Sequence, residues 1–286
     1  MRYIVIVALA GFLLHSCNPT TLVIRQMTPI LENSAQALYE ESDLIIAEQA
    51  MAANLKLVEG LLKSDPENED LLIIAAQGYS GYALAFTEDV DPQRAKLLYL
   101  RARDFAFRVL YKDPGFKKAK SEGLESVERL LKTYEAEKVP ALFWAGFAWA
   151  GFANLALDDP NALLALPEIQ LLMQRVEELQ PDYFYGAVYL FWGGMYGMKP
   201  VIMGGDPQKA GAYFKRNFEL NNNEFLLAHI YAAKFYAAKT LDEELFDSYI
   251  NHVLETPIEA RQDLKLLNQI AKEKAIRLMA EKEDLF

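Results

Sequence analysis

The chain has 286 residues and a formal net charge of −11. Its content of 52% hydrophobic and 12% aromatic residues is too high for an intrinsically disordered protein. The acidic excess would repel phosphate backbones, so we expect no nucleic-acid binding. The length suits one large or two small domains, and no internal stretch has the composition of a flexible linker. We therefore expect one continuous domain.

The N-terminus has the organisation of a secretory signal. Arg2 provides a positive start, and residues 4–14 form an unbroken apolar run. The run is about half the ~20 residues that a membrane-spanning helix needs, so it is a poor anchor by itself. We predict a signal peptide over residues 1–16.

The only cysteine of the chain, Cys17, follows this segment directly. Residues 14–17 read Leu-His-Ser-Cys and resemble the lipobox of bacterial lipoproteins, with His15 where a small or hydroxyl residue is more usual. We predict that Cys17 becomes the lipidated first residue, and acyl chains would tether the protein to a membrane. A tether over residues 17–28 then leads into a repeat domain over residues 29–286. A signal peptide with a chance cysteine is the alternative.

The repeat domain shows helical spacing almost throughout, without sustained strand-like alternation. Two segments repeat, DPQRAKLLYLRA at 91–102 and DPQKAGAYFKRN at 206–217. Each begins with aspartate as the expected N-cap and proline as the expected first helical residue. Each then has an alanine and, four residues later, an aromatic residue, as at Ala95 and Tyr99. The pattern predicts firmly started helices at both places.

This spacing is typical of the second helix of a tetratricopeptide repeat. Bulkier residues reproduce it near the C-terminus, at Leu245, Tyr249, His252 and Pro257. Bulky, small and aromatic residues suited to a first helix follow the segment KSDPEN, at Leu72, Ala75, Ala76 and Tyr79. We therefore predict an all-α, tetratricopeptide-like helical-repeat solenoid, in which each pair buries its apolar face against its neighbours.

The expected first helices are unusual, because residues 71–86, 141–157 and 184–198 are apolar almost all the way round. A surface helix normally has a polar stripe. In a tetratricopeptide superhelix the first helices line the concave surface, so an apolar concave side would face something other than bulk water. Core packing explains any single aromatic residue there. For the three helices together, an apolar lumen or a subunit interface is the other explanation.

Catalytic and metal-binding patterns are missing from the mature chain. Its histidines, His229 and His252, lack metal-ligand spacing, and no nucleophile elbow, phosphate loop or zinc-protease motif occurs. We expect no enzymatic activity, no cofactor and no metal site.

Several segments resemble the TRAP-transporter-associated T component (TatT) family of tripartite ATP-independent periplasmic transporters. They are residues 37–106, ALFWAGFAWAGFANLALDDP at 141–160, residues 181–210 and EKEDLF at 281–286. The likeness covers nearly the whole mature chain. It implies a periplasmic lipoprotein of degenerate tetratricopeptide repeats that forms a trimer with an apolar pore. The implied partner is the P component, the solute-binding protein of the transporter.

The resemblance carries over no catalytic residues, but its matching segments contain candidate ligand or lumen residues on the first helices. They are Gln77, Tyr79, Tyr82, Trp144, Trp149, Tyr185, Trp192 and Tyr196.

The leading hypothesis is a non-enzymatic accessory protein that binds or passes an apolar or amphipathic solute with the P component. A structural scaffold for an envelope assembly, its apolar face buried in protein, is the alternative. An enzyme with an unrecognised site is a third and weaker one. Asn18 stands where enteric lipoproteins retained in the inner membrane have aspartate. This favours the inner leaflet of the outer membrane.

Overall fold

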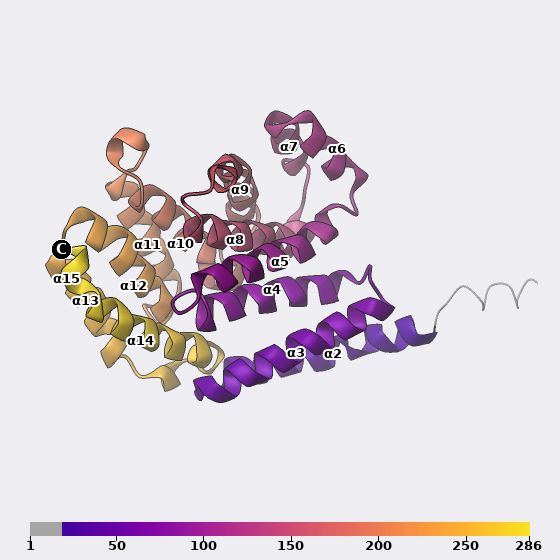
Figure 1. Ribbon diagram of the computed structural model, residues 1–286, viewed down its shortest axis with the longest axis horizontal. Helices are drawn as coiled ribbons and strands as arrows, with labels where there is room; N and C mark the ends of the chain where they lie inside the picture. Colours follow the sequence, from indigo (N-terminus) through magenta and orange to yellow (C-terminus); the bar gives the residue numbers. More distant parts are fainter. Residues whose placement is uncertain (1–18) are drawn as a thin grey trace, which may run out of the picture.

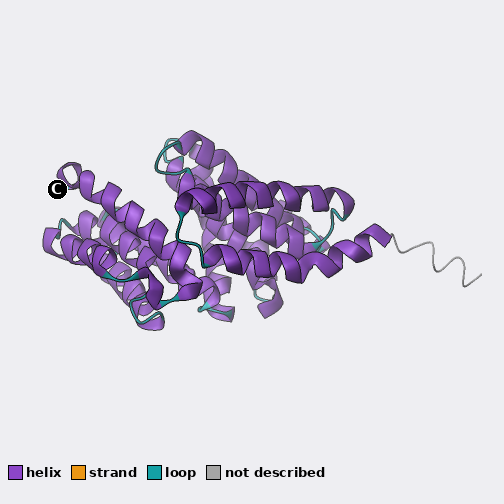
Figure 2. Cartoon of the chain, turned by 90° about the horizontal axis from the view of Figure 1, so that it is seen from below, coloured by secondary structure: helices purple, strands orange, loops and turns teal. Residues whose placement is uncertain are grey.

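The computed structural model describes residues 19–286, and this part of the chain forms fourteen α-helices and no β-strand (Figure 1, Figure 2). The helices are α2 (Pro19–Tyr39), α3 (Leu44–Ser64), α4 (Glu69–Phe86), α5 (Pro92–Leu110), α6 (Pro114–Glu122), α7 (Leu124–Leu131), α8 (Val139–Leu155), α9 (Pro160–Leu179), α10 (Tyr183–Gly197), α11 (Pro207–Leu220), α12 (Leu226–Ala232), α13 (Glu243–Glu255), α14 (Lys265–Ala280) and α15 (Lys282–Leu285). The prediction of an all-α helical-repeat fold is confirmed. None of these helices is both long enough and apolar enough to cross a bilayer.

The helices stack in chain order along an arc that turns back on itself. In Figure 1 the arc runs from α2 and α3 through α4, α8 and α10 to α12, and α14 then returns to lie beside α3. Helix α14 contacts both α2 and α3, so the repeat closes into a ring within one chain. Helices α6 and α7 project from the outside of this ring.

The predicted helix starts are present at both repeated segments. The Asp91 carboxylate accepts a hydrogen bond from the backbone N–H of Arg94 at 3.1 Å, and Pro92 is the first residue of α5. Asp206 caps α11 in the same way through the N–H of Lys209, at 3.0 Å. These caps satisfy backbone donors that would otherwise lack partners.

The N-terminal helix begins earlier than the sequence suggests. The predicted signal peptide and the lipidation site Cys17 lie outside the described residues. Residues 19–28, expected in the tether, form the first half of α2. Ile24 in this segment is buried in the core, and Arg25 pairs with Asp65 at 3.2 Å. Packing of this half of α2 on the repeat domain keeps it helical.

Helix α10 begins with an unusual left-handed turn, in which Phe184, Tyr185 and Gly186 have φ angles of 47°, 58° and 66°. Such angles are strained for residues with a side chain. The Asn217 amide of α11 holds the turn by donating to the carbonyls of Tyr185 at 2.8 Å and Gly186 at 2.9 Å. Asn221 donates to the Tyr185 carbonyl as well, at 3.0 Å.

Candidate functional site

The ring of helices encloses a cavity of about 970 Å³, which we call the lumen. Helices α4, α8, α10 and α12, which we call the inner helices, each line it with one face, on which the lining residues are mostly three or four positions apart. On α4 the lining includes Ile74, Gln77, Gly81, Leu84, Ala85 and Glu88 just beyond the helix end. On α8 it includes Trp144, Phe147, Ala150, Gly151 and Asn154, and on α10 it includes Phe184, Ala187, Leu190, Phe191 and Gly194, with Met198 just beyond the helix end.

The two ends of the chain complete the wall of the lumen. Leu38 of α2 and Met51 of α3 contribute from the N-terminal side, and Leu267 and Leu278 of α14 from the C-terminal side. Most of the lining side chains are apolar, as expected of a site for a small apolar or amphipathic molecule.

One end of the lumen, which we call the aromatic end, lies where the inner helices begin. The Trp144 indole of α8 donates to the Tyr183 hydroxyl at 3.2 Å, and the Trp144 and Phe184 rings are 4.9 Å apart. Tyr185 contacts the ring of Phe225, which precedes α12, at 5.4 Å. The inner helices therefore run in the same direction, with their N-terminal ends together.

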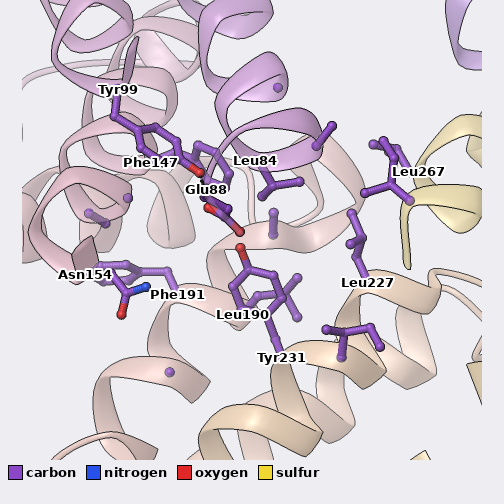
Figure 3. Close-up of a pocket in the computed structure, with 18 of the residues that line it drawn as sticks. Leu84, Glu88, Tyr99, Phe147, Asn154, Leu190, Phe191, Leu227, Tyr231 and Leu267 are labelled. Carbon is purple, nitrogen blue, oxygen red and sulfur yellow. Dashed lines mark hydrogen bonds between the residues drawn. The ribbon is translucent and has the colours of Figure 1, made fainter. Parts of the chain in front are cut away.

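The other end of the lumen holds a cluster of charged and hydroxyl groups and is called the charged end. The Lys274 ammonium, whose side chain is only 8% exposed, lies 2.8 Å from Glu88 Oε1 and 2.5 Å from Asp89 Oδ2. The Tyr99 hydroxyl donates to Glu88 Oε2 at 2.6 Å. Figure 3 shows the Tyr231 hydroxyl pointing from α12 toward the same carboxylate of Glu88.

The protonation states of this cluster follow from burial and charge. Burial alone would lower the pKa of Lys274, but the charges of Glu88 and Asp89 outweigh it and hold that pKa above the usual lysine value. Burial, followed by the charge of Glu88, raises the pKa of both the Tyr99 and the Tyr231 hydroxyl. Lys274 therefore stays charged at neutral pH, and both phenols keep their protons.

Two of the residues predicted to line a lumen, Gln77 and Trp144, do so. Trp144 is also a core residue, only 1% exposed. Gln77 donates to the Tyr39 hydroxyl at 2.6 Å. Tyr185 lies at the aromatic end, where it lines a smaller hollow with Gln77 and donates to the Asp263 carbonyl at 3.1 Å.

The remaining candidates lie outside the lining of the lumen, and those of α4 face α3. The Tyr79 hydroxyl donates to Glu59 at 2.7 Å, and the Tyr82 hydroxyl donates to Glu48 at 3.1 Å. Both bonds join α4 to its neighbour, so the structure gives these tyrosines a packing role.

The other three candidates, Trp149, Trp192 and Tyr196, face α5 and α11 on the outer side of the inner helices. Trp149 of α8 packs edge-on against Phe107 of α5, with ring centroids 5.5 Å apart. Trp192 and Tyr196 of α10 pack against Tyr213 of α11, at 6.3 and 5.9 Å.

Sequence reasoning missed the charged end altogether. One signal was available for Lys274, because it follows Leu267, Ile270 and Ala271 at helical spacing on an otherwise apolar stripe. A lysine in such a position is either paired or functional. Nothing local pointed to Glu88, which reads as an ordinary polar residue after a helix.

Comparison with known proteins agrees with the resemblance noted from the sequence. Residues 40–286 match the model of the family described as TRAP transporter T-component. An uncharacterized protein of Treponema pallidum (strain Nichols) is 26% identical over 268 residues, covering 86% of this chain and 81% of that protein. The match spans most of the ring, including every helix of the lumen wall except α2. The chain therefore belongs to the TRAP transporter T-component family.

Proposed function

We propose that the protein is a non-enzymatic periplasmic lipoprotein that binds an apolar or amphipathic solute and exchanges it with the solute-binding P component of a TRAP transporter. The observation that carries this proposal is the apolar lumen enclosed by the ring of helices. Family membership supplies the association with a TRAP transporter.

The size and lining of the lumen suit a ligand. Ligand pockets are typically about 300–1,000 Å³ and mostly apolar, with a few placed polar groups. The lumen, at about 970 Å³, is at the upper end of that range. A ligand that covered the apolar wall of the lumen would gain roughly 25 cal/mol of binding free energy per Å² of apolar surface removed from water.

Exposed apolar side chains at the charged end support contact with another protein. Leu157 and Met203 line the lumen and are exposed to solvent, and the neighbouring Ile202 is 95% exposed. Exposed apolar patches of this kind mark interaction sites. The P component and further copies of this chain, as in a trimer, are the partners that we propose.

Tryptophan fluorescence tests solute binding, because Trp144 alone of the three tryptophans lines the lumen. In a Trp149→Phe, Trp192→Phe protein, a lipophilic dye should accept energy from Trp144. Ala150→Phe fills the lumen and should weaken dye binding about tenfold or more, whereas Leu97→Phe on the exposed face of α5 should not. Unchanged dye binding by folded Ala150→Phe protein would reject the lumen as the site.

Crosslinking in intact cells tests the partner. Pull-down of the crosslinked protein should recover a solute-binding protein together with further copies of the chain. Recovery of an envelope assembly complex instead, from a protein that binds no dye, would favour the scaffold alternative.

Cell fractionation tests the anchor. The wild-type protein should remain with the membranes, and the Cys17→Ala protein should be released into the periplasmic fraction. Equal release of both proteins would show that no lipid is attached at Cys17.

A further inference from the structure

We propose that the solute carries a hydroxyl or amino head group, held between Tyr231 and Glu88 at the charged end, with its apolar tail directed toward Trp144. This inference rests on the proposed function, since it names the class of solute that the lumen takes. It assigns the charged end as the part of the lumen that selects the solute.

The charge of this partly buried cluster disfavours an anionic head group. Glu88 and Asp89 share the single ammonium group of Lys274, so the cluster has one uncompensated negative charge. A carboxylate or phosphate entering this end would add a second negative charge next to Glu88, whose side chain is only 18% exposed, so water screens the repulsion weakly. An ammonium group would balance the cluster, and a hydroxyl group would leave its charge unchanged.

The hydrogen-bonding groups that face the lumen point to a donor. The Tyr231 hydroxyl has no hydrogen-bond partner in the part of the chain from 19 to 286, although it points toward Glu88 (Figure 3). Glu88 already accepts from Tyr99 and Lys274, and carboxylate oxygens have further lone pairs to offer. A hydroxyl or amino group between the two residues would donate to Glu88, and a hydroxyl would also accept from Tyr231. A carboxylate would have no proton to donate.

The rest of the lumen suits an alkyl tail. Leu84, Leu190 and Leu227 lie next to the polar cluster, and Phe147 continues the apolar wall along α8 (Figure 3). From Asn154 to Trp144 the lining of α8 spans ten residues, which is about 15 Å at the helical rise. A linear chain of this length would reach the aromatic end.

The lumen also has cationic side chains at the outer edge of the charged end. Lys199, Lys234 and Arg277 line it, and none of them has an ion-pair partner within residues 19–286. Lys234 and Arg277 are exposed, so their attraction for an anion is screened by water and salt. The alternative hypothesis is that these cations bind an anionic solute. The experiment below distinguishes it from binding of a hydroxyl or amino head group.

The experiment uses three probes that share the same alkyl tail and differ in their head groups. Dodecan-1-ol, dodecylamine and dodecanoate are titrated at pH 7 into the full chain in which Trp144 is the only tryptophan, and displacement of the lipophilic dye is measured. Hydrogen bonds to a charged group are strong enough that the alcohol and the amine should bind at least about tenfold more tightly than the carboxylate.

Substitutions then locate the head group. Tyr231→Phe keeps the ring and removes the hydroxyl, so it should weaken dodecan-1-ol binding about tenfold. Glu88→Gln should reduce the discrimination against dodecanoate, because it removes one of the two negative charges. Tyr213→Phe, outside the lumen, is the matched control and should change neither property.

A bromine atom on the probe reports its orientation. 12-Bromododecan-1-ol should quench Trp144 fluorescence strongly, and 2-bromododecan-1-ol weakly, because the head lies at the far end of the lumen. Stronger quenching by the 2-bromo compound would overturn the proposed orientation.

The outcomes distinguish this inference from the proposed function. If the three heads bind equally, or dodecanoate binds most tightly, the head-group inference is wrong and the proposed function stands. If neither the dye nor any dodecyl probe binds the folded protein, both are wrong.

Discussion

Lys274 of α14 and Glu88, just beyond α4, are 186 residues apart in the sequence, and their side chains meet at 2.8 Å. The contact joins the last long helix to an early one and fastens the ring at the charged end of the lumen. A solenoid held only by neighbouring repeats would have no such contact. The ion pair is therefore one of the contacts that close the ring, beside the packing of α14 on α2 and α3.

Removing the ammonium group of Lys274 should destabilise the protein strongly. Lys274→Met leaves Glu88 and Asp89 beside each other without a cation, and because the two carboxylates are partly exposed the cost should be about 3 kcal/mol, the lower end of the range for a buried ion pair. Urea unfolding followed by circular dichroism measures the change. Arg277→Met, one turn later on the same helix and exposed, should cost less than about 1 kcal/mol. Similar losses in the two variants would show that the ring does not depend on Lys274.

Two glycines of α10 should respond oppositely to alanine. A Cβ atom at Gly197 would overlap the carbonyl oxygen of Phe235, so the backbone of the segment 233–237 would have to move. Overpacking of this kind costs typically about 1–3 kcal/mol. At Gly194 the nearest atom would be 3.8 Å away, so alanine should fit and stabilise the helix by roughly 0.5–1 kcal/mol. Thermal unfolding of both variants tests this, and equal melting temperatures would contradict the close approach at Gly197.

The left-handed turn of α10 should depend on Asn217, which is fully buried. Asn217→Leu keeps the side-chain size but removes the donor to the carbonyls of Tyr185 and Gly186, at a cost of about 1–3 kcal/mol. Loosening of the turn should also shift Trp144 fluorescence, because Phe184 packs on that indole.

Asn251→Leu is the control for this substitution, since Asn251 is exposed on α13. It should change stability by less than about 0.5 kcal/mol and leave the fluorescence unaltered. An unshifted Trp144 spectrum in Asn217→Leu protein would mean that the turn holds without its asparagine.

His229 should make the protein sensitive to acid. Burial, and then the nearby charge of His252, lower the pKa of His229 to about 3. The unfolded chain binds this proton near pH 6.5, so the unfolded state gains protons first as the pH falls. Stability should therefore decline from about pH 6.5 toward pH 3, by up to about 1.4 kcal/mol per pH unit from this group.

The variant His229→Phe isolates that contribution. It keeps the stacking on Phe218, whose ring lies 4.1 Å from the imidazole, and removes the titrating group. Urea unfolding at pH 7, 6 and 5 should show a flatter pH dependence than in wild-type protein, whereas His252→Phe should keep most of the slope. Parallel curves for wild-type and His229→Phe protein would show that another group causes the acid sensitivity.

Much of the fold follows from local signals in the sequence. The Asp91-Pro92 and Asp206-Pro207 pairs determined two helix starts, because an N-cap and a first-position proline act within one turn. Apolar spacing likewise determined the all-α class. The family resemblance rests on whole segments of sequence, so it could be recognised without the structure.

The lumen-facing side of each inner helix was decided only by the tertiary structure. On α8, Phe147 turns inward and Trp149 outward, and on α10, Phe191 turns inward and Trp192 outward. A helix that is apolar on every side has no polar stripe to indicate its buried face, so its neighbours determine the orientation. The pairing of Lys274 with Glu88 arises in the same way, since closing a ring over 186 residues depends on the curvature of the whole stack.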